Sequence, residues 1–158
     1  TFGASVNYDY QISPKVVWRA ELKKYHSKDA IFRYAQNSNE QTSATMALAD
    51  GIGAGRKNTA IIIASQGYGN GDVYAARICN EYQVTDANGV VYGDWYLPSK
   101  IEAQLMQDKH NHLPNYNNSE YRWTSNESSE GSAYYYLQNS SSTNTKNNYY
   151  FVRAIRSF

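Results

Sequence analysis

Cysteine is nearly absent from the sequence, since Cys79 is the only one among 158 residues. A single thiol excludes an internal disulfide and a zinc site built from several cysteines. Histidine is also scarce, and only His110 and His112 have a spacing that could chelate a metal from an extended segment. Their surroundings, KHNHLPN, indicate the end of a helix followed by a loop. We therefore expect solvated histidines, no bound metal and no cofactor.

Net charge is nearly absent too, because 15 Lys and Arg residues oppose 14 Asp and Glu residues. No overall field therefore indicates a nucleic-acid or membrane partner. No apolar run reaches the length that spans a bilayer, and no signal peptide is recognisable. The chain opens on Thr1 rather than Met, so we expect a piece of a longer protein. Its scarcity of cysteine fits the cytosol and equally fits bacterial surface proteins that have no disulfides.

Catalytic motifs are missing as well. No Ser lies in a Gly-x-Ser-x-Gly turn. The segment DGIGAGRKNT resembles a phosphate loop only in its glycines, because no Gly-Lys-Ser/Thr follows. Gly51, Gly53 and Gly55 instead predict unusual dihedral angles or a close approach of the backbone. We assign Asp94 and Glu102 to capping and hydrogen bonding, and we expect no enzyme.

Tyrosine is the residue that the sequence has in excess, with 16 against 4 Phe and 3 Trp. Tyr is large, stiff and amphipathic, so a Tyr-rich surface can bind a partner and stay soluble. Tyr is also favoured in strands, and both explanations can hold together. The length is enough for one sizeable core, which predicts a single domain over residues 1–158.

Helix signals occur at three places. Asn58 can cap a short helix that runs through Gln66 and stops at Gly67, although its Ile-Ile-Ile run could equally be a buried strand. Asp72 can cap a second helix over residues 73–82. This helix has a small apolar face, which favours close packing against a sheet and a core position for its cysteine. The face consists of Ala75, Ala76 and Cys79.

The third helix has the clearest signal. Ser99 and Glu102 form a Ser-x-x-Glu capping box, so a helix should run over residues 100–109. Its predicted buried stripe consists of Ile101, Leu105 and Met106.

The last third of the chain is expected to be rich in strands. The predicted strands cover residues 15–22 near the start and then 121–125, 133–138 and 149–157. The polar segments 36–43 and 139–148 (NSSSTNTKNN) are predicted as loops, the second as a hairpin tip. Trp95 and Trp123 are expected to anchor the core. At least one of Arg153 and Arg156 is expected to form a buried or half-buried ion pair.

Five motifs in this order carry a family resemblance: GIGAGRKNT at 51–59, AARIC at 75–79, GDWYLPSK at 93–100, RWTSNE at 122–127 and YFVRAIR at 150–156. With them the chain resembles the Lcl C-terminal domain family, named after a collagen-like adhesin of Legionella. The resemblance covers residues 44–158 well and residues 1–43 weakly.

The resemblance implies an α+β fold like that of C-type lectins, with short helices packed on a small, twisted, mostly antiparallel sheet and a loop-rich binding face. It also implies an extracellular or bacterial-surface adhesin module without catalytic activity. Such a module would bind host or surface glycans, above all sulfated glycosaminoglycans as in heparin, for attachment and biofilm formation, and a homotrimer is its expected assembly. The Glu-Pro-Asn or Gln-Pro-Asp loops of calcium-dependent sugar binding do not occur, so calcium is not predicted.

A sulfated ligand requires clustered cations, since each neutralised sulfate releases counterions. The candidate cations are Lys23, Lys24 and Lys28 in one loop, Arg56 and Lys57 in the glycine-rich segment, and Arg122 and Lys146 near the end of the chain.

The alternative hypothesis is a receptor-binding protein with a diversified surface, as found in some relatives of this fold that belong to retroelements or phages. Residues 132–150 are rich in Ser, Asn, Thr and Tyr, which resembles an antibody paratope. In both hypotheses we place the site on the loop face of residues 133–148. Tyr134 and Tyr136 would share one face of a strand and stack on a sugar ring or an aromatic epitope. Hydrogen bonds would come from Asn144, Lys146 and Asn147.

Overall fold

A five-stranded sheet lies at the centre of the structure, a computed structural model that describes residues 10–13, 16–18, 31–35, 43–67, 73–113 and 116–157. The strand order is β3-β9-β6-β7-β8. The strands are β3 (Ile31–Arg33), β6 (Arg122–Ser129), β7 (Ser132–Leu137), β8 (Ser140–Thr145) and β9 (Tyr149–Phe151). Every pairing is antiparallel except that of β6 with β9. The predicted α+β fold with a mostly antiparallel sheet is therefore confirmed.

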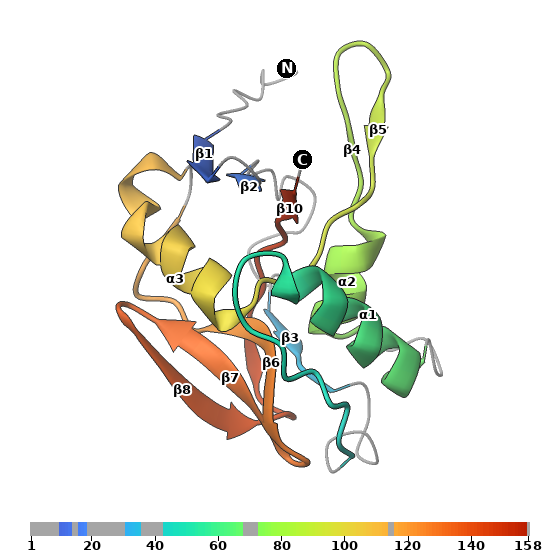
Figure 1. The fold of residues 1–158 in the computed structure, drawn as a ribbon, viewed down its shortest axis with the longest axis vertical. Coiled ribbons are helices and arrows are strands. Elements are labelled where there is room, and N and C mark those ends of the chain that lie inside the picture. The colour runs from blue at the N-terminus through green and yellow to red at the C-terminus, as the bar shows by residue number, and fades with distance from the viewer. Residues whose placement is uncertain are drawn as a thin grey trace.

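Three α-helices pack around this sheet within the described residues (Figure 1): α1 (Ala54–Gln66), α2 (Ala75–Glu81) and α3 (Lys100–Asp108). Helix α3 lies on β6 and β7, whereas α2 packs mainly on α1. A short 3-10 turn, η2 (His110–His112), follows α3. None of the described helices combines the length and the apolar character that crossing a membrane requires.

Two smaller sheets complete the fold. Strand β2 (Val16–Trp18) pairs with β1 (Tyr10–Ser13) and with β10 (Arg156–Ser157). Strands β4 (Val84–Thr85) and β5 (Val91–Tyr92) form a hairpin that projects from the body of the molecule (Figure 1). The strand predicted over residues 15–22 is confirmed over Val16–Trp18. Its ends, most of the predicted loop over residues 36–43 and the predicted Asp72 cap lie outside the described residues.

Helix α1 begins earlier than the sequence indicates. Its first residue is Ala54, so the predicted cap at Asn58 is wrong. Asn58 lies inside the helix, where its buried amide accepts the Ala49 N–H and donates to the Ala49 carbonyl. The predicted end at Gln66 with Gly67 beyond it is confirmed, and the isoleucine run is helical rather than a strand.

The glycines before α1 make this start possible. Gly51 and Gly53 have φ angles of 111° and 84°, in the left-handed region that glycine adopts most easily. Gly55 has a different role, because a Cβ there would lie 2.5 Å from the Leu97 carbonyl oxygen and 2.8 Å from the Ser99 nitrogen. Unusual dihedral angles and close backbone approach, the two predicted reasons for these glycines, are both confirmed.

Helix α3 starts at the predicted capping box. The Ser99 hydroxyl accepts the Glu102 N–H, and the Glu102 carboxylate accepts the Ser99 N–H. The buried face differs from the prediction, since Ile101 is 41% exposed while Met106 is buried. Glu102 and Gln107 are also buried, because both have hydrogen-bond partners in the interior. Apolar periodicity alone therefore misplaced this face.

The C-terminal third contains more strand than predicted. The loop predicted over residues 139–148 is wrong for most of its length, because β8 pairs with β7 along six successive residues. The single strand predicted over residues 149–157 is divided into β9 and β10. A strand whose two sides are both exposed needs no alternation of apolar residues, so the polar composition concealed β8.

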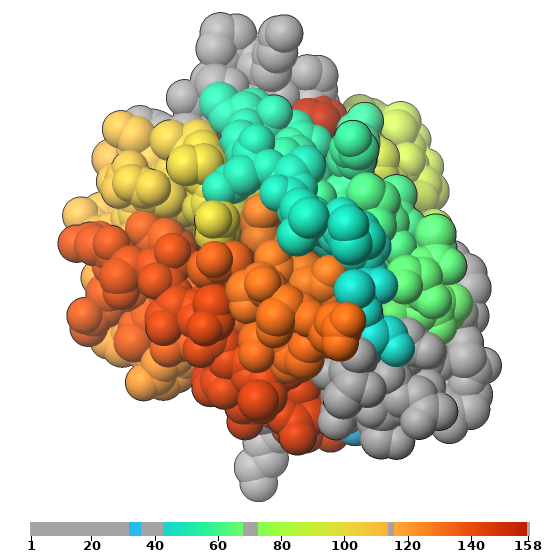
Figure 2. All heavy atoms as spheres, turned by 60° about the horizontal axis from the view of Figure 1, so that its bottom comes forward, coloured from blue at the N-terminus to red at the C-terminus, as the bar shows by residue number. Residues whose placement is uncertain are grey.

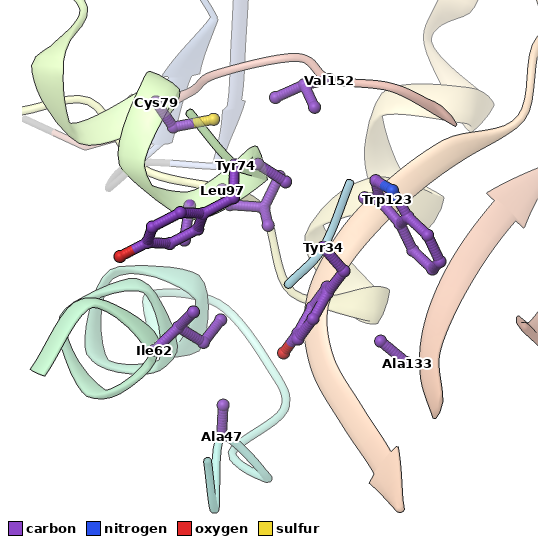
Figure 3. Packing of buried hydrophobic residues seen from close by; sticks show 11 residues of the cluster. Tyr34, Ala47, Ile62, Tyr74, Cys79, Leu97, Trp123, Ala133 and Val152 are labelled. Carbon is purple, nitrogen blue, oxygen red and sulfur yellow. The ribbon is translucent and has the colours of Figure 1, made fainter. Parts of the chain in front are cut away.

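Two tryptophans anchor the interior, as predicted: Trp95 is 2% and Trp123 is 1% exposed. Trp123 meets Tyr34 edge to face, with ring centres 5.7 Å apart, and the two rings lie beside β6 in Figure 3. Cys79 of α2 belongs to the same cluster, as predicted. Burial raises the pKa of its thiol, which disfavours the reactive thiolate.

We expect Gly55→Ala to lower the free energy of unfolding by about 3 kcal/mol or more, because the new methyl group would press on backbone atoms that cannot move away. Gly89→Ala is the matched control. Gly89 has a φ of 82° but open space around it. Gly89→Ala should therefore lower the free energy of unfolding only by the backbone strain of a left-handed alanine, about 1–2 kcal/mol. Urea unfolding measures both, and equal losses would contradict the close contact at Gly55.

Candidate functional site

The N-terminal candidates Lys23, Lys24 and Lys28 lie outside the described residues. Arg56 and Lys57 lie in the first turns of α1 and are exposed. The Arg56 guanidinium is 3.5 Å from the Asp94 carboxylate. These two cations are at the surface, but on a different element from the C-terminal strands that carry the other candidates.

Lys146 is buried, with an exposed fraction of 0%. Its ammonium group is bonded to the Glu127 carboxylate and donates to the Ser43 carbonyl at 2.7 Å. The same carboxylate accepts the N–H groups of Thr45 and Met46. The predicted surface role of Lys146 is therefore wrong, because this cation neutralises an interior carboxylate that holds residues 43–46 in place.

Arg122 is not a free surface cation either, since it is only 5% exposed. It is paired with Glu120, and its guanidinium lies 4.0 Å from the centre of the Tyr116 ring. Arg153 lies near the same ring, at 5.3 Å. Burial, followed by the charge of Arg122, lowers the pKa of Arg153 to about 10. The arginine predicted to bind an acidic ligand is thus part of a buried cluster.

Tyr134 and Tyr136 lie on one face of β7, as predicted, but helix α3 covers that face. Tyr136 is 6% exposed and packs with Met106 of α3. Burial raises the pKa of the Tyr136 phenol. The Lys100 ammonium lies 4.4 Å from the centre of the Tyr134 ring. The two rings are therefore engaged by the protein itself and do not form an open platform.

The opposite face of β7 carries an aromatic cluster that the sequence reasoning missed. The rings of Tyr121, Tyr135 and Tyr150 have centres 5.0–5.4 Å apart. Tyr150 also lies 4.7 Å from the buried Trp123, which ties the cluster to the core. Tyr121 is 44% exposed, and the other two tyrosines are half-buried. The cluster is thus both rigidly supported and accessible.

Strand β8 adds polar groups to this face. Ser142 lies directly opposite Tyr135, and Asn144 is two residues further on the same side. The Asn144 amide donates to the Tyr150 hydroxyl. Asn147, another predicted site residue, lies beyond the end of β8. It is exposed and accepts a hydrogen bond from the Thr145 hydroxyl. In Figure 2 the orange to orange-red segments, which include β6, β7 and β8, form one continuous area of the surface. We define the tyrosine face as Tyr121, Tyr135, Ser142, Asn144 and Tyr150.

The tyrosine face has little charge around it. Ion pairs neutralise many of the described cations: Arg56 and Arg156 with Asp94, Arg77 with Glu81, Lys100 with Asp50, Arg122 with Glu120, and Lys146 with Glu127. The pair of Arg156 and Asp94, at 3.0 Å, confirms the predicted half-buried pair at one C-terminal arginine. Residues 132–145 carry no charged side chain. This surface therefore offers rings, amides and hydroxyls.

Metal-ligating residues are dispersed in the part of the chain that the structure describes, where no three His, Cys, Asp or Glu side chains form a group that could hold an ion. Comparison of the chain with family models, curated proteins and solved structures finds no match.

We expect Lys146→Met to lower the free energy of unfolding by about 3–5 kcal/mol, because it leaves the Glu127 carboxylate buried without its cation. Lys57→Met, at an exposed position of α1, is the control and should change stability by less than about 0.5 kcal/mol. Urea unfolding of both variants measures the difference. A Lys146→Met protein as stable as the parent would contradict the buried pair.

Proposed function

We propose that the chain is a non-catalytic binding module of an extracellular or cell-surface adhesin, and that it binds uncharged glycans through the tyrosine face. The observation that carries the proposal is the cluster of Tyr121, Tyr135 and Tyr150, accessible at its outer side and supported from below by Trp123. An aromatic ring packs well against the apolar face of a sugar ring, while its hydroxyl remains available for hydrogen bonds.

The polar groups around the rings suit the same ligand. Asn144 is oriented by its bond to the Tyr150 hydroxyl, and its neighbour Ser142 is exposed. Amide and hydroxyl groups can donate to and accept from sugar hydroxyls, and a held amide loses little conformational freedom on binding. The site thus combines an apolar platform with oriented polar groups, the usual composition of small-molecule sites.

An uncharged ligand is favoured over a sulfated one because nearby positive charge is already neutralised. Arg122 is paired with Glu120 and Lys146 with Glu127, so neither adds net charge to the face. Binding a sulfated glycosaminoglycan depends on cations that exchange counterions for sulfates. Arg56 and Lys57 are exposed, but they lie on α1. The sulfated ligand that the family resemblance implies therefore has less support than a neutral saccharide.

We also propose that the α+β fold is of the C-type lectin kind. An α+β domain with a lectin-like arrangement is consistent with the positions of the resembling motifs. GIGAGRKNT spans the glycines and the first half of α1, GDWYLPSK leads into the capped α3, and RWTSNE forms the first part of β6. These segments meet around Glu102 and Glu127, so the motifs correspond to the structural framework. Membership of the Lcl C-terminal domain family and a trimeric assembly remain proposals on this basis.

A protein receptor is the second candidate ligand. The side chains of β8 are almost all exposed, and they are Ser, Thr and Asn next to tyrosines. This is the chemistry with which antibody loops recognise protein surfaces.

We expect the wild-type protein to bind neutral glycans on a glycan array equally strongly at low and high salt. Tyr121→Ala and Tyr135→Ala should each weaken binding about tenfold, which corresponds to about 1.4 kcal/mol of lost ring contact. Tyr149→Ala is the matched control, because Tyr149 is 56% exposed but adjoins Tyr150 in β9 and therefore points to the other side.

Two results would contradict the proposal. The first is binding to sulfated glycans alone, with an affinity that falls steeply as salt rises. The second is unchanged binding by the Tyr121→Ala and Tyr135→Ala proteins when their urea midpoints match that of the parent.

A further inference from the structure

Strand β8 forms one edge of the main sheet, and none of the described strands pairs with its outer side. It lies at the boundary of the molecule in Figure 1, beyond β7. An open edge presents unpaired N–H and C=O groups and can therefore recruit another strand.

The hairpin between β7 and β8 determines which groups point outward. Its loop consists of Gln138 and Asn139, and the flanking residues Leu137 and Ser140 face each other. In such a two-residue hairpin the flanking pair exchanges backbone hydrogen bonds, and every second residue after it does the same. The backbone groups of Ser141 and Thr143, and of the residue two further on, therefore point away from β7.

Thr145 shows that this alternation is correct and where the open edge ends. Its N–H donates to the Asn144 side-chain oxygen at 2.8 Å, and its carbonyl accepts the Asn148 N–H at 3.1 Å. Both groups are satisfied locally instead of by β7. The outward-pointing backbone groups that remain on β8 are the two N–H and two C=O groups of Ser141 and Thr143.

This edge has none of the usual features that prevent strand addition. Natural edge strands are commonly protected by charges, by proline or by a bulge. Residues 132–145 contain no charged residue and no proline. The six successive pairs between β7 and β8 contain no irregularity, whereas the pairing of β6 with β7 contains two shifts. The outer edge of β8 is thus regular and uncharged.

We propose that β8 pairs with the β8 strand of a second copy of this chain, antiparallel and around a two-fold axis at Ser142. In this register Ser141 of each copy faces Thr143 of the other, and the two pairs exchange four backbone hydrogen bonds. The two Ser142 side chains lie opposite each other on the tyrosine side. A second copy is the fitting occupant because Ser and Thr pairs across strands are favourable and no like charges meet.

The contact is small, so the dimer is weak. Hydroxyl side chains bury little apolar surface, and four backbone hydrogen bonds alone resemble the smaller transient interfaces. The two-fold contact closes at two copies, so the trimer that the family resemblance implies would need a separate contact between copies. Dimerisation would join two tyrosine faces in one continuous sheet and raise the avidity for repeated ligands, a consequence that rests on the proposed function.

Charge reversal at Ser142 tests the pairing. Ser142→Lys and Ser142→Asp each place like charges opposite each other across the axis, so each variant alone should sediment as a monomer at concentrations where the parent dimerises. An equimolar mixture of the two should recover the dimer, because opposite charges then meet. Sedimentation equilibrium at low salt measures all three samples. Recovery in the mixture cannot result from a folding defect, since both variants are present in it.

Two further variants make the result specific. Thr143→Pro removes only an outward-pointing N–H, which an edge strand tolerates, and should also give a monomer. Ser128→Lys, at an exposed position of β6, should dimerise like the parent. A parent that is monomeric at every concentration overturns the proposal and leaves an extended segment of another protein as the alternative occupant of the edge. A dimer or trimer unaffected by the Ser142 and Thr143 changes also overturns it.

Discussion

The buried carboxylate of Glu102 is the interaction on which the arrangement of the fold depends. It accepts the N–H groups of Gly53 and Gly55 at the start of α1, the N–H of Ser99 at the start of α3, and the hydroxyl of Tyr96. A carboxylate at a helix N-terminus satisfies donors that the helix leaves open and is stabilised by the helix dipole. One side chain therefore caps two helices, and the close approach of α1 requires the absence of a side chain at residue 55.

The Glu127 carboxylate likewise accepts backbone N–H groups, those of Thr45 and Met46 in the segment before α1, and Lys146 neutralises its charge. The two carboxylates hold residues 43–55 between the helices and the sheet. Helix α3 covers the side of Tyr136, whereas the main core around Trp123 and Ala133 covers only part of the other side and leaves Tyr121 exposed and Tyr135 half-buried. The candidate binding surface is thus the part of this side that the core leaves uncovered.

The sequence predicted those structural features that depend on a residue's own type or on its neighbours along the chain. The capping box at Ser99, the glycines before α1 and the buried tryptophans each depend on neighbouring residues or on sheer size. Lys146 could not be placed in this way, because its partner Glu127 is distant in sequence and exposed lysines are far more common. The alternation in β7 placed two tyrosines on one face, but the packing of α3 on that face and of the main core on the other decides how far each ring is exposed. β8 was missed because an edge strand exposed on both sides has no apolar pattern.

We propose that recognition takes place on the tyrosine face. An NMR titration of protein with labelled tyrosine rings, using the neutral glycan that the array retains best, tests it most directly. We expect the ring signals of Tyr121, Tyr135 and Tyr150 to shift with a single binding constant, while those of Tyr134 and Tyr136 remain in place. A shift of the Tyr96 ring signal, which lies beside Arg56, with the three tyrosine-face signals unchanged, would contradict this placement.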